Sequence, residues 1–260
     1  RSQNYINVFD PTTKFMRGRF RNTWFAPFDP YEVNFNYTEA NSWQYSFYVP
    51  HDITGFMNLL GGKDQLEKQL DNLFIADDKT SGREQADITG LIGQYAHGNE
   101  PSHHMAYLYN FVNKPHKTQE KTRQILTELY TNSPDGISGN EDCGQMSAWY
   151  IFSSLGFYPV TPGSNQYIIG SPLFDKATIH LEDGKLFTVE AKNNSFENKY
   201  IKNVQLNNKA YPFSYLNHSD LVNGGNLVFE MTDSPTNWGT SDNFIPSTEI
   251  KDHKIIPAPF

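Results

Sequence analysis

Hydrophobic positions in the first part of the chain recur with a helical period. The spacing predicts four helices, at residues 62–74, 101–112, 116–130 and 146–155. Pro101 suits the first turn of its helix, and Gly156 directly follows the last one, where a left-handed residue commonly ends a helix. The pattern therefore predicts a helical region over residues 1–164.

From about residue 165 the hydrophobic period changes to two, which is typical of half-buried strands. Four runs show it, at residues 177–181, 186–191, 201–206 and 226–231. Turn-forming residues at 182–185 and 207–209 separate neighbouring runs. We expect an antiparallel β module over 165–240, then an extended tail at 241–260, in a mainly helical α+β fold.

Composition narrows the class of partner. Aromatic residues make up 15% of the chain; most belong in a core, and stacking on sugar rings is the functional alternative. The net charge of −8 argues against nucleic acid, and no apolar run approaches the length of a membrane span. No signal peptide is visible at the first residues. The single cysteine argues against an internal disulfide and against a cysteine zinc site.

Two adjacent acids, Glu141 and Asp142, lie in a Gly/Asn-rich turn just before a predicted helix. Oriented backbone N–H groups at such a position keep a carboxylate ionised, which suits a general base or a metal ligand. A plain helix cap fits the same pattern. Cys143 beside them is a weak candidate nucleophile, because no histidine lies within its motif, and we expect a small buried thiol instead.

Glu39 precedes a dense aromatic run that includes Trp43, Tyr45 and Tyr48. Such surroundings would partly desolvate a carboxyl group and suit it to general acid work. The alternative is a glutamate in the first turn of a helix. Paired with an ionised Asp142, a protonated Glu39 would form the acid and base of a glycosidase.

Asn99 and Glu100 stand at a predicted helix start and carry the hard oxygen ligands that calcium takes. Capping of the helix is the alternative reading. His103 and His104 do not form a metal pair by spacing, because adjacent helical residues point about 100° apart.

Five motifs together resemble the bacterial exo-acting α-mannosidases of glycoside hydrolase family 92. They lie at residues 38–45, 97–104, 139–149, 156–160 and 169–175, in the order of that family. The resemblance covers residues 5–235. It implies a β-sandwich domain followed by an (α/α)6 barrel, and it implies calcium-dependent hydrolysis of terminal α-linked mannose with inversion at the anomeric carbon.

The resemblance also implies roles for individual residues. Glu39 would be the general acid and Asp142 the general base, with Glu141 as an assistant. The candidates around calcium are Gln44, Asn99, Glu100 and Asp142. The candidates for contact with the mannose-containing substrate are Trp43, Gln44, His97 and Asn140.

Two departures from the family pattern matter. Some members carry aspartate where this chain has Asn140. It is therefore open how the residues at positions 140–142 share the role of general base. The helices number about half of the twelve that a barrel needs, and no sandwich precedes them. We therefore expect a C-terminal portion of an exported, periplasmic or cell-surface enzyme; the alternative is a catalytically incomplete carbohydrate-binding or structural fragment.

Overall fold

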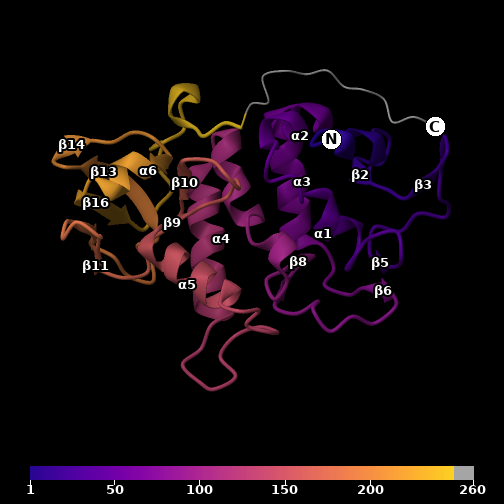
Figure 1. The fold of residues 1–260 in the computed structure, drawn as a ribbon, viewed down its shortest axis with the longest axis horizontal. Coiled ribbons are helices and arrows are strands. Elements are labelled where there is room, and N and C mark those ends of the chain that lie inside the picture. The colour runs from indigo at the N-terminus through magenta and orange to yellow at the C-terminus, as the bar shows by residue number, and fades with distance from the viewer. Residues whose placement is uncertain (249–260) are drawn as a thin grey trace. The chain divides into compact units, whose positions relative to one another are not determined.

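The computed structural model describes residues 1–248, and within them the chain divides into two compact units. Unit 1 comprises Arg1–Met105, Ile137–Asn140 and residues 247–248, and unit 2 comprises Ala106–Gly136 and Glu141–Pro246. The predicted tail at 241–260 lies outside the described residues from position 249 onward. Helices and strands together make a mixed α+β fold (Figure 1).

Unit 1 is built around three α-helices, which are α1 (Ser42–Ser46), α2 (Ile53–Leu60) and α3 (Lys63–Ile75). The last of these confirms the helix expected at 62–74. It buries one face, formed by Leu66, Leu70, Leu73 and Phe74. Helix α2 begins where the Asp52 carboxylate accepts from the backbone N–H of Gly55, and it ends at the left-handed Gly61.

Short two-residue strands surround these helices in unit 1. They are β1 (Phe9–Asp10), β2 (Phe15–Met16), β3 (Arg19–Phe20), β4 (Thr23–Trp24), β5 (Glu32–Val33), β6 (Ser81–Gly82), β7 (Leu91–Ile92) and β8 (Tyr95–Ala96). The 3-10 helix η1 (Asn4–Val8) precedes them. Irregular segments of this kind depend on side-chain contacts for their conformation, because their backbones make few ladder hydrogen bonds.

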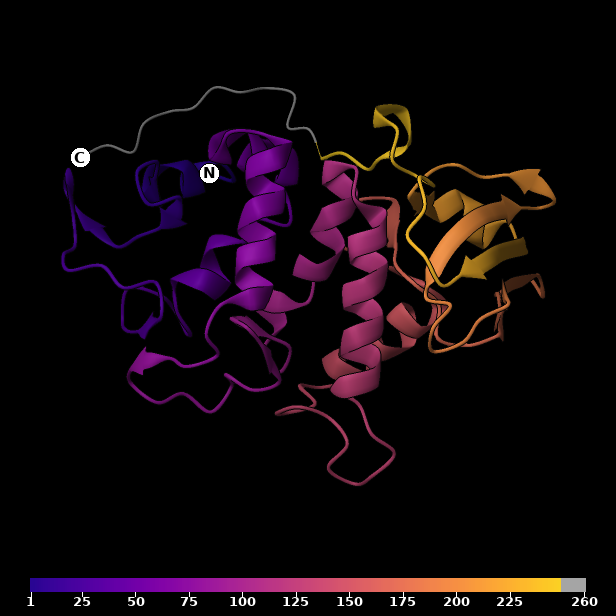
Figure 2. The ribbon, with the colours of Figure 1, turned by 180° about the vertical axis from the view of Figure 1, so that it is seen from behind.

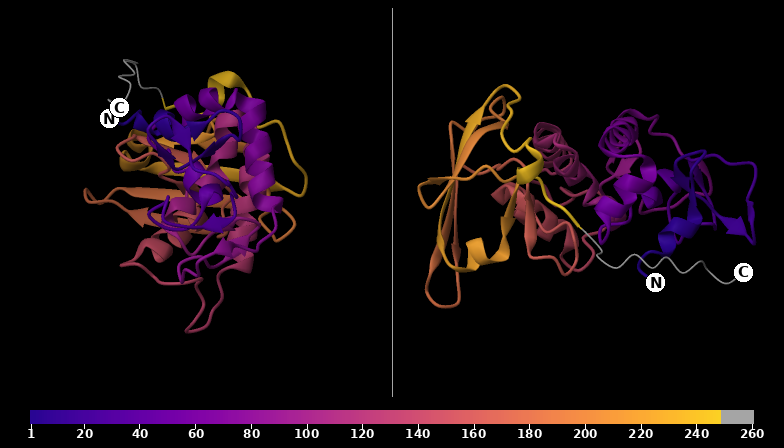
Figure 3. Two further views of the ribbon diagram at one scale, coloured as in Figure 1. Left: turned by 90° about the vertical axis from the view of Figure 1, so that its right-hand side faces the viewer. Right: turned by 90° about the horizontal axis from the view of Figure 1, so that it is seen from above.

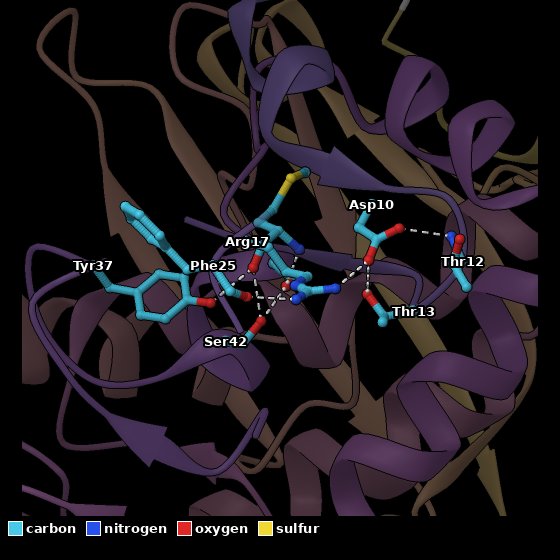
Figure 4. Close-up of polar contacts among 9 residues, drawn as sticks. Asp10, Thr12, Thr13, Arg17, Phe25, Tyr37 and Ser42 are labelled. Atoms are coloured by element: carbon cyan, nitrogen blue, oxygen red, sulfur yellow. Dashed lines mark hydrogen bonds and ion pairs between the residues drawn. The ribbon is translucent and has the colours of Figure 1, made fainter. Parts of the chain in front are cut away.

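A buried ion pair provides such contacts near the N-terminus. Arg17 donates to the Asp10 carboxylate at 2.7 Å and to the Phe25 carbonyl at 2.6 Å (Figure 4). Burial alone would raise the pKa of Asp10, but Arg17, Thr12 and Thr13 all hydrogen-bond to its carboxylate, and the pKa is lowered. The pair therefore ties the loop around residue 25 to strand β1.

Unit 2 contains helices α4 (Pro115–Glu128), α5 (Gln145–Leu155) and α6 (His218–Val222). The first two confirm the helices expected at 116–130 and 146–155, and Gly156 closes α5 in the left-handed region as expected. The connection from α4 to α5 forms a long loop beyond the ends of both helices (Figure 2).

The five-stranded sheet of unit 2 has the order β11-β12-β16-β13-β14. Its strands are β11 (Lys176–His180), β12 (Leu186–Lys192), β16 (Gly225–Thr232), β13 (Tyr200–Leu206) and β14 (Lys209–Ala210). A smaller sheet joins β15 (Tyr215–Asn217), β10 (Gln166–Ile169) and β9 (Phe157–Tyr158). The strands gather on one side of α4 and α5 (Figure 3), and Phe152 of α5 packs on their apolar core.

Two expectations about these elements were wrong. The module is not purely antiparallel, because β12 and β16 pair in parallel along residues 187–192 and 225–230. A parallel pair needs a long connection, and the chain makes one through β13, β14, β15 and α6. The helix expected from Pro101 is instead two 3-10 segments, η2 (Glu100–Ser102) and η3 (Met105–Val112).

Candidate active site

Glu39 lies outside helix α1, in the turn that leads into it. The helix starts at Ser42 with Asn41 as its N-cap, and the Asn41 side chain accepts from the backbone N–H of Gln44 at 3.2 Å. Ala40, between Glu39 and the cap, has a left-handed φ of 57°. The reading of Glu39 as a first-turn helix residue is therefore wrong, because Asn41 performs the capping.

The Glu39 carboxyl group is half-buried and is held by a neighbouring tyrosine. Tyr45 donates its hydroxyl proton to Glu39 Oε1 at 3.1 Å. Burial, and then the Glu39 charge and hydrogen bond, raise the pKa of Tyr45, so this hydroxyl stays protonated and remains a donor. Sequence reasoning did not single out this contact, although Tyr45 stood in the aromatic run.

Two other candidates, Trp43 and Gln44, are buried in α1. The Trp43 ring is 7% exposed and packs edge-on against Phe15, with 4.7 Å between the ring centroids. Gln44 is fully buried, and neither its Oε1 nor its Nε2 finds a hydrogen-bond partner within residues 1–248. An unpaired buried amide costs about 1–3 kcal/mol, which a bound polar group would offset.

Helix α1 packs against η2, which carries Asn99 and Glu100. Asn99 occupies the N-cap position of η2 but makes no side-chain capping hydrogen bond. Its Nδ2 is buried without a partner in the described part of the chain, as is the hydroxyl of Ser102. Glu100 is half-buried in the first turn. The capping explanation for Asn99 is therefore wrong for its side chain.

The segment that ends in Asn140 lies against the same region of unit 1. A Cβ on Gly98 would collide with the Thr89 hydroxyl and lie 3.0 Å from the Ser138 carbonyl. A Cβ on Gly139, whose φ is +75°, would lie 3.4 Å from the Gly98 carbonyl. Only glycine permits this approach of two backbones. Three motifs far apart in the sequence thus meet within unit 1, while Asn140 itself is exposed.

His97 is fully buried beside these groups, and its Nδ1 lies 2.8 Å from the Tyr95 hydroxyl. Burial, and then the neighbouring His103, lower the pKa of His97 well below its ordinary value. His103 donates to the His97 carbonyl and His104 to the Phe47 carbonyl, so the two adjacent rings serve separate backbone contacts. A neutral His97 can orient a substrate hydroxyl but cannot supply a positive charge.

In unit 2 the loop before α5 carries Glu141 and Asp142. Glu141 Oε2 accepts from the backbone N–H of Gly144, and its Oε1 accepts from that of Ser147 at 2.9 Å. The hydroxyl and N–H of Ser147, with the N–H of Gly144, lower the pKa of Glu141. Asp142 is exposed and has a left-handed φ of 51°. Cys143 is also exposed, so the expectation of a buried thiol was wrong.

The profile of the glycosyl hydrolase family 92 catalytic domain matches residues 1–233. The chain belongs to glycosyl hydrolase family 92. Within the described residues, no helix is long and apolar enough to cross a membrane.

Three relatives show how far this membership extends. A family 92 α-mannosidase of Bacteroides thetaiotaomicron, solved with mannoimidazole, is 42% identical with a TM-score of 0.89; the match covers 94% of this chain and 33% of that one. An inverting family 92 mannosidase of the same organism is 37% identical with a TM-score of 0.83, over 95% and 35%. An uncharacterized secreted glycosidase of Arthroderma benhamiae is 31% identical over 80% of this chain and 25% of its own length.

This family 92 chain thus spans about a third of the length of the solved structures that it matches. Within residues 1–248, no group of three or more His, Cys, Asp or Glu side chains could hold a metal ion. A cation site in unit 1 would have to use amide oxygens as well. Gln44 and Asn99 offer such oxygens, and the unpartnered Gln44 Oε1 suits a hard cation.

Proposed function

We propose that the protein releases terminal α-linked mannose from glycans by an inverting exo-mannosidase mechanism. The observation that carries the proposal is the convergence in unit 1 of the Glu39 turn, α1 and η2, beside the 137–140 segment. Buried polar groups of Gln44 and Asn99 there have no hydrogen-bond partner in the described part of the chain. Membership of family 92, and relatives that are mannosidases, support the substrate class.

Glu39 acts as the general acid in this proposal. Its protonated carboxyl gives a proton to the glycosidic oxygen as the bond from C1 to that oxygen breaks. Tyr45 holds Oε1, so Oε2 is the oxygen left to carry the proton. Asp142 acts as the general base and removes a proton from the water that attacks C1 from the opposite face. This inversion requires carboxyl groups about 6.5–9.5 Å apart.

Calcium is the proposed cofactor, and the unit 1 residues fit it. Gln44, Asn99 and Glu100 would supply hard oxygens to it, and Asp142 is the fourth candidate. When bound, the ion would hold mannose O2 and O3 and favour a flattened ring. The chain itself contributes a dry, rigid support, because Gln44 and Asn99 are both almost completely buried.

The remaining substrate contacts are proposed for His97, Asn140 and Trp43. Neutral His97, fixed by Tyr95, would orient a sugar hydroxyl, and exposed Asn140 would offer its amide. Trp43 packs in the core, so it would act through its Nε1–H, which has no partner among residues 1–248, rather than as an open stacking platform. Its ring would at the same time fix the position of α1.

Several features of the whole protein belong to the same proposal. The helices would form part of an (α/α)6 barrel, and a preceding β-sandwich domain would complete the substrate site. We also propose an exported location, at the periplasm or cell surface, which agrees with a secreted relative. The span of about a third of the solved relatives favours one alternative, namely that these 260 residues alone bind sugar without turnover.

The test uses the full-length natural protein and α-linked mannobioses. We expect release of β-mannose as the first product, seen by NMR, and loss of activity after calcium is removed with EDTA and its return after calcium is added. Unchanged hydrolysis in Glu39→Gln, or in the metal-free protein, would refute the mechanism. Calorimetry of the 260-residue chain with mannose and calcium separates sugar binding without turnover from the absence of both.

A further inference from the structure

Three consecutive residues before helix α5 adopt the left-handed conformation. Their φ angles are 51° at Asp142, 56° at Cys143 and 99° at Gly144. Glycine accepts this region readily and aspartate tolerates it, whereas cysteine rarely adopts it. Three such residues in a row are uncommon, so a contact that spans Asp142 and Cys143 would help to fix this backbone.

The Glu141 carboxylate supplies that contact. It reaches over Asp142 and Cys143 to accept from the N–H of Gly144 and, with its other oxygen, from the N–H of Ser147 in the first turn of α5. The backbone carbonyl of Glu141 also accepts from Met146 N–H at 3.3 Å. The N-cap position itself is Gly144, which has no side chain to cap the helix. Glu141 thus closes a loop whose enclosed residues are Asp142 and Cys143.

Both oxygens of Glu141 are occupied by backbone donors, whereas Asp142 is exposed. To approach a water molecule, either oxygen of Glu141 would have to give up a hydrogen bond to the helix backbone. A base that is exposed and held in one backbone conformation meets the geometric need of general base catalysis.

We infer that Glu141 is a positioning residue, which fixes the backbone at Asp142 and does not itself accept the proton from water. The inference rests on the proposed function, since it concerns the base of that reaction. It assigns separate duties to the two adjacent acids: Glu141 closes the loop, and Asp142 faces the reacting water.

The experiment compares Glu141→Gln with Asp142→Asn in the full-length protein, on α-linked mannobiose. Glutamine keeps one acceptor oxygen but turns an N–H towards a backbone N–H. We expect kcat to fall between about tenfold and 100-fold in Glu141→Gln, with KM within about twofold and the acidic limb of the pH–rate profile retained. Asp142→Asn should lose that acidic limb. Glu182→Gln, an exposed acid in a turn of unit 2, is the charge-matched control and should leave kcat unchanged.

Loss of the acidic limb in Glu141→Gln would overturn the inference, because Glu141 would then be the base. An unchanged kcat would overturn it as well. Amide exchange gives a readout that needs no activity: Gly144 and Ser147 N–H should exchange at least about tenfold faster in Glu141→Gln than in the wild type. If these two amides already exchange rapidly in the wild type, Glu141 does not close the loop, and the inference is overturned. If the wild type cleaves no mannoside, the proposed function fails, and the exchange result still decides whether Glu141 closes the loop.

Discussion

The helices that follow the two candidate carboxylates, α1 in unit 1 and α5 in unit 2, begin in different ways. Helix α1 has an N-cap side chain, Asn41, next to the turn that carries Glu39. Helix α5 starts at Gln145 with Gly144 at its N-cap position, and the capping carboxylate comes from Glu141, three residues before that glycine. At each helix start, one side chain accepts hydrogen bonds from the free backbone N–H groups. A nearby acid, Glu39 or Asp142, takes no part in this capping. Because other residues do the capping, Glu39 and Asp142 are available for the acid and base roles that we propose.

The largest effect on activity is expected from substitution of the two acids that do not cap a helix. In the full-length protein, Glu39→Gln and Asp142→Asn should each lower kcat on α-linked mannobiose by about 10²–10⁴, the usual contribution of general acid or base catalysis. Melting temperatures should stay close to the wild type, because neither acid caps a helix. A large fall in melting temperature would mean that the acid has a structural task after all.

A second substrate separates the acid from the base. Fluoride leaves α-mannosyl fluoride without protonation, so Glu39→Gln should cleave it at nearly the wild-type rate, whereas Asp142→Asn should remain slow. Equal losses for the two variants on this substrate would contradict the assignment of Glu39 as acid. Initial rates of fluoride release, followed with an ion-selective electrode, decide between these results.

Removal of a capping side chain should have the opposite result, namely a loss of stability with less effect on the rate of catalysis. Asn41→Ala removes the side-chain cap of α1. It also removes the buried donor to Gln94 Oε1, which lies 2.8 Å from Asn41 Nδ2 in the wild type. We expect a loss of about 2–3 kcal/mol in the free energy of unfolding, measured by urea titration. Asn58→Ala, on the exposed side of α2, is the control and should change it by less than about 0.5 kcal/mol. Equal effects would show that Asn41 does not hold α1.

The other end of α1 gives a pH-dependent prediction. His104 donates to the carbonyl of Phe47, the C-cap residue of α1, at 2.7 Å. Burial, with a smaller contribution from His103, lowers the pKa of His104 to about 4, against 6.5 ordinarily. The unfolded chain therefore binds the proton first as pH falls. The stabilisation by neutral His104 is complete above about pH 6.5 and is lost as pH falls towards 4.

Urea midpoints at pH 8 and pH 5 measure this effect. The wild type should lose about 2 kcal/mol between these pH values through His104, and buried His97 adds a loss in the same direction. His104→Gln keeps a donor for Phe47 but no longer titrates, so it should lose less stability over the same interval. An identical pH dependence in the variant and the wild type would contradict the role of His104.

Sequence patterns located the elements that depend on local periodicity. The stripe of Leu66 and Leu70 predicted α3, and Gly156 predicted the end of α5. The parallel pairing of β12 with β16 could not be predicted, because pairing partners 38 residues apart leave no local trace. The 3-10 geometry after Pro101 was missed for a similar reason, since periodicity alone does not separate 3-10 from α-helix over a few residues.

The candidate site was partly accessible from sequence as well. Asn41 and Ser42 form a readable helix start, and it would have placed Glu39 outside α1. The contact of Tyr45 with Glu39 had no such signal, because a spacing of six residues corresponds to no common helical face. The capping by Glu141 was one of two readings of its motif, and only the positions of the Gly144 and Ser147 N–H groups distinguish them.

The smallest expected effect on kcat comes from loss of the contact between Tyr45 and Glu39. It tests whether the Tyr45 hydroxyl orients the Glu39 carboxyl group. Tyr45→Phe removes the hydroxyl that donates to Glu39 Oε1 but keeps the ring, whose centroid lies 6.0 Å from that of Tyr37. The carboxyl should then sample more orientations, so kcat on mannobiose should fall about tenfold. Cleavage of α-mannosyl fluoride should not change, because it needs no acid. Tyr48→Phe, on the neighbouring exposed ring, is the control. Equal losses in both variants would mean that Tyr45 acts through the aromatic cluster and not through its hydroxyl on Glu39.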